Sequence, residues 1–171
     1  MKIIRRKHPK VVHPKVVLRG AYHPQFNYWS DDDLKPTRST DGSAGYDLRA
    51  DIPEGEEIVI NPGESYVFST GVTLEPITRN WTAYVYSRSG ISTNKKVMLL
   101  NGVAVIDPDY RGVIHAPLIN FGKEPMRIHR GDRIAQICFF PFGIPSLQKV
   151  PTCMMSTTGR GKGKFGHTGV Q

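Results

Sequence analysis

The sequence predicts an all-β domain, either a sandwich or a barrel, for most of the 171 residues. Short runs of alternating or β-branched residues recur along the chain, and turn-forming stretches such as NPGE, DPDYRG, FGKEP and HRGD separate them. The 17 glycines and 13 prolines are spread along the chain, and no apolar pattern keeps a helical period beyond about two turns. Many short strands at this spacing are typical of an all-β architecture.

The expected elements follow from these runs in order. EEIVI and WTAYVYS are rich in β-branched and aromatic residues, SYVFSTGVTLE alternates, and RIAQICFFPF is a continuous apolar run. The expected strands are 56–60, 65–75, 81–87, 96–100, 102–106, 112–120, 124–130 and 133–142. DGSAGYDLRA (41–50) predicts a turn leading into a strand, and SGISTNKK (89–96) predicts a helix of a turn or two.

Three regions differ in composition. Residues 1–33 are interpreted as a basic N-terminal extension and polar linker, with one strand expected at 15–19. Residues 34–155 are expected to form the β domain. Residues 156–171, rich in glycine and cations, are expected to be a flexible C-terminal arm.

Charge is concentrated at the N-terminus. The formal net charge is +8, and seven Lys or Arg but no acid lie in residues 1–20. The body of the protein is therefore not a basic nucleic-acid-binding domain. The extension is expected either to contact nucleic acid weakly or to be merely solvated.

The sequence excludes several classes of protein. A hydrophobic content of 39% is ordinary for a globular protein, and no apolar run approaches the roughly 20 residues that span a bilayer. The N-terminal cations precede no apolar stretch, so a secretory signal is not expected. Two cysteines make no disulfide framework, and Cys138 is expected to be a buried free thiol. A cytoplasmic location is expected.

Four stretches carry candidate chemistry. In DGSAGYDLRA, Asp47 is the one charge among apolar neighbours, and backbone amides in a turn could equally satisfy it. In SRSG (87–90), a guanidinium, hydroxyls and a glycine suit phosphate oxygens, although a turn with a surface arginine explains them too. In GDRIAQ (131–136), Gln136 is a polar residue in an apolar run and needs a partner.

The fourth stretch, NGVAVIDPDYRG (101–112), predicts a hairpin whose strands meet at the turn DPDY. The alternation of Val103, Val105 and Asp107 predicts that all three face the core side. A carboxylate held there is a candidate general base, and the alternative is a turn-capping side chain, the role expected of Asp109.

Two other sites are not supported by the sequence. TGRGKGKF in the tail differs from a phosphate loop, because Thr158 replaces the first glycine and Phe165 follows the lysine. The six histidines and two cysteines lack the spacing of metal ligands. Taken alone, the tail is equally consistent with a disordered basic end that carries one aromatic ring.

In order and spacing, SAGYDL, RSG, VIDPDYRG, GDRIAQ and the tail RGKGKFGHTG resemble the five motifs of the trimeric dUTP pyrophosphatases (dUTPases), from about residue 34 to 171. The resemblance implies a jelly-roll-like β domain in a homotrimer. It also implies three active sites at subunit interfaces, each closed by the C-terminal arm of a neighbouring subunit. The expected reaction is hydrolysis of dUTP to dUMP and pyrophosphate, which keeps uracil out of DNA.

The resemblance also implies residue roles. Asp107 would deprotonate a water for in-line attack on the α-phosphorus, and Asp47 would support the site from behind. Tyr110 would exclude a 2′-hydroxyl, and Phe165 would stack on uracil. Mg²⁺ would be held by the triphosphate and water rather than by protein ligands. The residues expected to contact dUTP are Arg88, Ser89, Gly90, Asn101, Val105, Ile106, Tyr110, Gln136, Arg160, Phe165, Gly166, His167 and Thr168.

Some positions depart from the family pattern. Ala104 replaces a usual glycine, Ser87 a common proline, and Lys164 the second glycine of the arm. The related dCTP deaminases place a glutamate three residues before a strand-end asparagine, whereas Pro117 precedes Asn120 here, so deamination is not expected. A regulatory or binding protein that lost turnover is the alternative, but Asp107, Tyr110 and Phe165 argue against it.

Overall fold

The computed structural model describes residues 24–161 of the chain. The expected strand at 15–19 and the predicted substrate contacts of Phe165, Gly166, His167 and Thr168 lie outside these residues. Within the described residues, no helix is long and apolar enough to cross a membrane.

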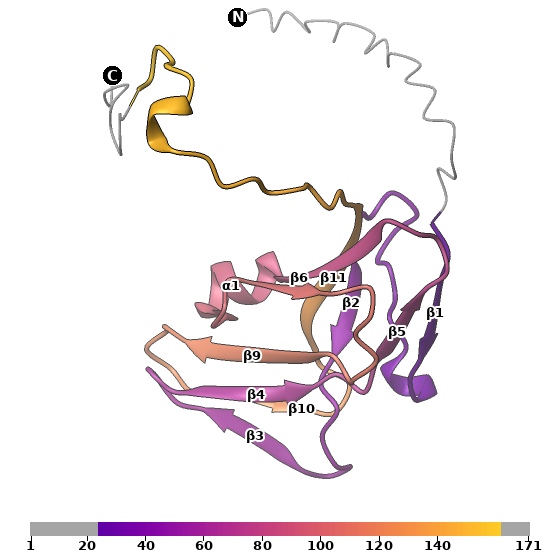
Figure 1. The fold of residues 1–171 in the computed structure, drawn as a ribbon. Coiled ribbons are helices and arrows are strands. Elements are labelled where there is room, and N and C mark those ends of the chain that lie inside the picture. Colours follow the sequence, from indigo (N-terminus) through magenta and orange to yellow (C-terminus); the bar gives the residue numbers. More distant parts are fainter. Residues whose placement is uncertain (1–23, 162–171) are drawn as a thin grey trace, which may run out of the picture.

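Most elements are short strands, as the sequence predicts (Figure 1). The strands are β1 (Phe26–Trp29), β2 (Tyr46–Arg49), β3 (Glu57–Ile60), β4 (Ser65–Ser69), β5 (Thr73–Pro76), β6 (Trp81–Ser87), β7 (Val97–Leu99), β8 (Val103–Ile106), β9 (His115–Asn120), β10 (Met126–His129) and β11 (Arg133–Pro141). The helix α1 (Ser89–Lys95) confirms the prediction for 89–96, and two 3₁₀ turns, η1 (Asp32–Leu34) and η2 (Thr152–Met154), complete the list.

The strands form four antiparallel sheets around one core. The largest has the order β2-β11-β6-β8, a second has the order β4-β9-β7, and the pairs β1-β5 and β3-β10 flank them. The described residues thus form a jelly-roll-like all-β domain, which confirms the predicted fold class.

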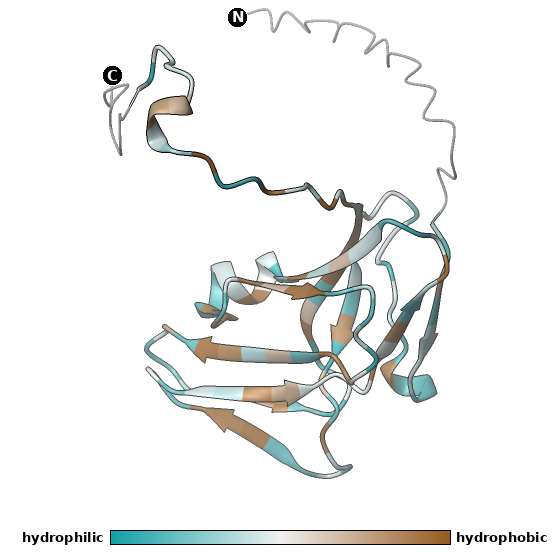
Figure 2. Cartoon of the chain, in the orientation of Figure 1, coloured by the Kyte–Doolittle hydropathy of each residue, from teal (hydrophilic) through white to brown (hydrophobic). Residues whose placement is uncertain are grey.

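Apolar side chains on the inner faces of the sheets fill the space between them. Phe68, Val85, Leu118 and Ile137 come from β4, β6, β9 and β11 and are each at most 1% exposed. Figure 2 shows the corresponding apolar stretches along these strands. Burial of such side chains is the main favourable contribution to folding.

The run 65–75 was expected to be one strand, but it forms two. Gly71 interrupts it with a φ of 65°, and a Cβ at this position would lie 2.6 Å from Cδ1 of Leu34. The left-handed backbone turns the chain from β4 to β5 and makes room for the fully buried Leu34.

Part of the predicted polar linker is folded against the domain. β1 pairs with β5 over Phe26–Trp29, although sequence patterning does not predict this strand. η1 follows, and Arg130 fixes it to the turn between β10 and β11. The Arg130 guanidinium donates hydrogen bonds to Asp33 (2.7 Å), Asp51 (2.6 Å) and Asp31 (3.1 Å).

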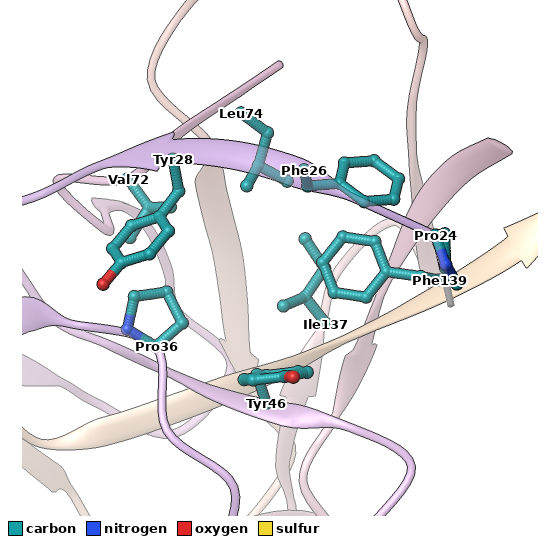
Figure 3. A pocket seen from close by; sticks show the side chains of 9 residues that line it. All are labelled: Pro24, Phe26, Tyr28, Pro36, Tyr46, Val72, Leu74, Ile137 and Phe139. Atoms are coloured by element: carbon teal, nitrogen blue, oxygen red, sulfur yellow. The ribbon is translucent and has the colours of Figure 1, made fainter. Parts of the chain in front are cut away.

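A cavity of about 410 Å³ separates the β1-β5 pair from β2 and β11. Figure 3 shows that apolar and aromatic side chains line it, among them Phe26, Tyr28, Tyr46 and Phe139. None of the residues expected to contact the substrate lies in its wall.

After β11 the chain leaves the sheets and runs outward, as Figure 1 shows. Its apolar side chains are uncovered, since Ile144 is 85% and Leu147 is 92% exposed. Figure 2 shows these apolar positions along the extended segment. Within the described residues, this segment does not pack against the β domain of its own chain.

The contacts of Arg130 are expected to make the stability of the fold depend on pH. The Arg130 hydrogen bond holds the pKa of Asp33 below its ordinary value, so the pair stabilises the fold above pH 3.9, about the unperturbed carboxyl pKa. This stabilisation is lost as the pH falls through the lowered pKa. R130M should therefore be less stable than wild type at neutral pH, and urea unfolding at several pH values should show the difference shrinking below about pH 4.

R127M is the matched control, because Arg127 pairs with Glu57 on an exposed surface. Its unfolding free energy should differ little from wild type at any pH. A difference between wild type and R130M that stays constant to about pH 2 would contradict the role of Asp33.

Candidate active site

The outer face of the four-stranded sheet carries Asp47, Gln136 and Val105 from the predicted site. The strand registers place Asp47, Gln136, Tyr86 and Val103 in one row across β2, β11, β6 and β8. Side chains alternate between the two faces of a strand, so these four lie opposite the core-facing Leu48, Val85 and Ile137. The cavity in Figure 3, which Tyr46 and Ile137 line, lies on the core side of this sheet.

Asp47 is the centre of a charged cluster at one end of this face. It is 8% exposed, and its two carboxylate oxygens accept from different arginines. Oδ1 accepts from Nε of Arg88 at 2.6 Å, and Oδ2 accepts from Nη1 of Arg133 at 3.2 Å. The Ser39 hydroxyl is 3.5 Å from Oδ2. Asp47 therefore orients two guanidiniums, and its supporting role in the active site stays a prediction.

Arg88 is held by a second contact, because its Nη1 donates to the carbonyl oxygen of Arg133 at 3.0 Å. It follows β6 directly and is the N-cap residue of α1. Ser89 and Gly90 open the helix and are exposed beside it. The structure thus brings the three residues of RSG to the same end of the sheet as Asp47.

Gln136 has the partner that its apolar surroundings require. Its Nε2 donates to the carbonyl oxygen of Ser87 at 2.9 Å. A Cβ at Gly45 would lie 2.9 Å from its Oε1, so glycine is needed for β2 to approach this side chain. Ser87, which replaces a common proline, accepts a hydrogen bond from the Leu99 amide through Oγ at 2.8 Å.

The predicted orientation of β8 is wrong. Val103 and Val105 are 42% and 58% exposed, whereas Ala104 and Ile106 pack against the core. The pairing of β8 with β6 decides this, because it turns Ala104 and Ile106 to the side of the buried Ala83 and Val85. The side chain of Ile106 therefore does not reach the outer face.

Asp107 follows β8 and is exposed. Among the described residues, its carboxylate makes no hydrogen bond or ion pair. β8 ends at Ile106, and Asp107, one residue past the strand, is exposed rather than packed in the core as predicted. A solvent-facing carboxylate without a protein partner is able to accept a proton from a water molecule.

The turn after Asp107 differs from the expected hairpin. The return strand β9 pairs with β4 and β7, whereas β8 pairs with β6. Hydrogen bonds from Ile114 to Val72 and from Thr70 to Ile114 direct the chain into the other sheet. Asp109 does not cap the turn, because its side chain makes no hydrogen bond within the described residues.

Tyr110 closes this turn. Its amide donates to the carbonyl oxygen of Asp107 at 3.0 Å, and its hydroxyl donates to that of Val113 at 2.9 Å. A Cβ at Gly112 would lie 2.4 Å from the Tyr110 hydroxyl oxygen, so only glycine allows the ring this position. The ring is 42% exposed and is available to a ligand.

The predicted site residues form two groups at opposite ends of β6. Asp107 lies opposite Thr82, next to the pair of Ile106 with Ala83, whereas Arg88 follows the other end of β6. Six residues of extended strand separate the two ends, about 20 Å. Asn101 lies at the Arg88 end, before β8, and Arg160 lies on the outward-running C-terminal segment. One chain therefore does not bring its own Asp107 and Arg88 together.

Three residues near the site were not singled out by sequence reasoning: Arg111, Arg133 and Thr82. Arg133 belongs to the GDRIAQ stretch and Arg111 to DPDYRG, so their charge inside these motifs was a usable signal. Thr82 lies in an ordinary strand run, and only the register with β8 places it beside Ile106.

The donor set near Asp47 does not suit a protein-held metal ion. No group of three or more His, Cys, Asp or Glu that could hold a metal occurs among residues 24–161. Both oxygens of Asp47 are engaged by arginines. Nearby Cys138 is a free, partly buried thiol, and burial raises its pKa.

Asn120 has a structural role. It is fully buried, and its Nδ2 donates to the carbonyl oxygens of Ile60 (2.9 Å) and Glu124 (2.8 Å). Its Oδ1 accepts from the Gly122 amide at 2.8 Å. With its amide fully bonded to backbone, this residue does not form the deaminase-type site that Pro117 already argued against.

Comparison with known proteins agrees with the fold. The sequence model of the dUTPase family matches residues 33–169. The chain is 42% identical over 135 residues to a deoxyuridine 5′-triphosphate nucleotidohydrolase of Desulfitobacterium hafniense, covering 79% of this chain and 87% of that protein.

Solved structures are similar as well. A dUTPase from Streptococcus mutans is 30% identical, with a TM-score of 0.61 over 71% of this chain and 98% of that one. A Staphylococcus bacteriophage 80alpha dUTPase has the same fold, with 24% identity and a TM-score of 0.71 over 85% of this chain and 99% of that one. The fold is thus that of the jelly-roll nucleotide hydrolases that these structures represent. The chain belongs to the dUTPase family.

D47N is expected to destabilise the protein and to loosen Arg88. Asparagine keeps one acceptor oxygen but no charge, and its NH2 group cannot accept from the second guanidinium. This costs about 1.5–3 kcal/mol for the charged hydrogen bond lost. Chemical denaturation measures the change. E57Q, which breaks an exposed ion pair with Arg127, should cost at most about 1 kcal/mol. Equal costs for D47N and E57Q would contradict a structural role for the Asp47 cluster.

Proposed function

We propose that this protein hydrolyses dUTP to dUMP and pyrophosphate. The observation that carries the proposal is that the two ends of one sheet carry complementary groups. Asp107, whose carboxylate has no partner among residues 24–161, follows β8 at one end, and two arginines bound to Asp47 lie at the other. Curated relatives are named for this activity, and the phage 80alpha structure contains dUpNHpp. The activity would lower dUTP and supply dUMP for thymidylate synthesis.

In this mechanism Asp107 takes a proton from a water molecule, which attacks the α-phosphorus in line with the leaving pyrophosphate. Exposure and the absence of a partner among residues 24–161 leave its carboxylate accessible to that water. Tyr110 packs against the deoxyribose and leaves no space for a 2′-hydroxyl. Asn101 and the exposed backbone beside Val105 read the uracil edge.

The phosphates bind to a neighbouring chain, at the Arg88 end of its four-stranded sheet. Arg88, oriented by Asp47, neutralises phosphate charge with Ser89 and Gly90 beside it. Gln136 uses one of the two N–H groups of its amide on Ser87 and offers the other to a phosphate oxygen. Positioning and charge neutralisation supply most of the acceleration in reactions of this type.

Mg²⁺ would neutralise the triphosphate and be held by phosphate oxygens and water. The donor set fits this arrangement, because Asp47 is occupied by arginines and no cluster of metal-binding side chains lies within 24–161. A phage phi11 dUTPase is described as coordinating a structural Mg(II) ion. No residue of this chain is proposed as a direct ligand.

The active site would be shared between subunits of a homotrimer. Arg88 and Asp107 of one chain lie about 20 Å apart along β6, too far to act on one triphosphate. The outer face between them is apolar, with Tyr84, Tyr86 and Phe140 in aromatic contact and Val105 exposed. Exposed apolar faces of this kind mark protein interfaces.

The C-terminal arm would close the site of a neighbouring subunit. The outward course of the segment after β11 and the exposure of Leu147 support an arm that leaves its own domain. Arg160 would reach the phosphates, Phe165 would stack on uracil, and Gly166, His167 and Thr168 would contact the nucleotide.

The remaining proposals rest on composition. Residues 1–23 lie outside the described residues, and weak contact of this extension with nucleic acid stays a prediction from its charge. A cytoplasmic location is proposed from the reduced cysteines and from the nucleotide substrate.

The proposed chemistry predicts a selective enzyme with a single essential carboxylate. Pyrophosphate release with Mg²⁺ should be far faster from dUTP than from dTTP, dCTP or UTP. D107N should lower kcat by about 100- to 10,000-fold, because it removes a general base, while binding of a non-hydrolysable dUTP analogue is retained. D109N changes the neighbouring carboxylate of the same turn and should leave kcat nearly unchanged.

Comparable rates across the four nucleotides would refute the specificity proposal. Full activity in D107N would refute the general base. Binding of the analogue without hydrolysis of any nucleotide would instead indicate a regulatory or binding protein that has lost turnover.

A shared site predicts complementation between inactive variants. R88A and D107N should each be inactive alone, but refolding an equal mixture should restore activity. A site that combines Asp107 from one subunit with Arg88 from another would be intact in about one quarter of random pairings. The molar mass in solution should be about three times the chain mass. No recovery in a mixture shown to exchange subunits would mean that each chain builds its own site.

A further inference from the structure

The backbone at Asp107 sets the direction of the Asp107 carboxylate. The side chain is exposed and has no hydrogen-bond or ion-pair partner among residues 24–161. Catalytic groups in other sites are commonly oriented by a neighbouring side chain, and Asp107 has none here. Its position relative to an attacking water is therefore set by the turn Asp107–Tyr110, and whatever fixes that turn also aims the carboxylate.

Arg111 holds the second half of this turn. Its Nη1 donates to the carbonyl oxygen of Pro108 at 2.7 Å and to that of Tyr110 at 3.0 Å. One guanidinium nitrogen thereby joins the carbonyls that flank Asp109. Arg111 forms no ion pair within the described residues, although it is exposed and its family motif is rich in carboxylates.

Thr82 holds the residue that precedes the turn. It is 4% exposed, and its Oγ1 donates to the carbonyl oxygen of Ile106 at 2.6 Å. Ile106 immediately precedes Asp107, and its side chain is packed against the core. The hydroxyl of Thr82 therefore fixes the last strand residue at the point where the chain enters the turn.

These contacts act on opposite flanks of Asp107. The amide of Tyr110 closes the turn onto the Asp107 carbonyl oxygen at 3.0 Å, and side-chain hydrogen bonds reach carbonyl oxygens on both sides of Asp107. Thr82 supplies the bond on one flank and Arg111 supplies two on the other. Each side chain bonds backbone oxygens only, so neither contacts the carboxylate itself.

The geometry points to Thr82 and Arg111 as positioning residues that aim Asp107. This inference rests on the proposed function, in which Asp107 activates the attacking water. Displacing a reacting group by about 1 Å costs on the order of 100-fold in rate, so loss of either anchor slows the chemical step. Substrate affinity is little affected, because the phosphates and uracil are bound by other residues.

The test uses T82V and R111M in the full-length protein. T82V removes the hydroxyl at nearly constant volume, and R111M removes the guanidinium but keeps much of the side-chain length. Each should lower kcat for dUTP by about 10- to 100-fold. The dissociation constant of a non-hydrolysable dUTP analogue should change by at most about twofold, because binding contacts are kept.

Two variants are matched controls. T70V also removes a buried threonine hydroxyl that donates to a backbone carbonyl oxygen, that of Ile114 at 2.8 Å. R127M removes an exposed arginine that pairs with Glu57. Neither residue bonds the Asp107 turn, so both variants should keep wild-type kcat whatever their effect on stability. T82S keeps the hydroxyl and should recover most of the kcat that T82V loses.

Hydrogen exchange gives a readout that does not depend on turnover. In T82V and R111M the Tyr110 amide, which bonds Asp107, should exchange faster than in wild type, and in T70V and R127M it should not. Should R111M fail to fold, R111K with the same measurements takes its place, since lysine keeps the charge but bonds a single carbonyl well.

Three outcomes would overturn the proposal while leaving the proposed function intact. The first is wild-type kcat in T82V and R111M. The second is a loss of analogue affinity in R111M as large as its loss of kcat/KM, which would make Arg111 a substrate contact. The third is an equal loss of kcat in T70V. A wild-type protein that fails to hydrolyse dUTP would instead refute the proposed function.

Discussion

The pairing of β6 with β11 on one side and β8 on the other is the constraint on which the site depends. This register sets the row from Asp47 to Val103 and turns Val105 to the outer face. It also places Arg88 and Asp107 at opposite ends of the same strand. A seven-residue strand is nearly inextensible, so no side-chain movement within one chain closes this gap.

The functional side chains at the two ends of the sheet are held in place by different interactions. At the phosphate end, one nearly buried carboxylate, Asp47, fixes Arg88 and Arg133 by charge-assisted hydrogen bonds. At the other end, Asp107 has no such partner within the described residues, and backbone bonds from Thr82 and Arg111 fix its turn. A guanidinium needs an anion to orient it, whereas a general base loses strength when a cation holds it.

Exposed apolar surface connects the fold with assembly. The outer face of the largest sheet and the segment after β11 leave Val105, Phe140 and Leu147 uncovered. Isolated exposed apolar residues are ordinary, but a continuous aromatic and aliphatic face next to charged site residues is typical of an interface between chains. The proposed trimer covers that face and completes the site in the same step.

The sequence by itself determined the all-β class, β6 at 81–87, the helix near 89–95 and the stretches that carry the site residues, because alternation and turn chemistry are local. It did not predict β1, the break at Gly71 or the outward face of Val103 and Val105. Only the tertiary structure decided these, since β5, the buried Leu34 and the register with β6 are distant in sequence. The orientation of a strand and the partner of a carboxylate depend on which segments pack together, and local patterning carries no information about that.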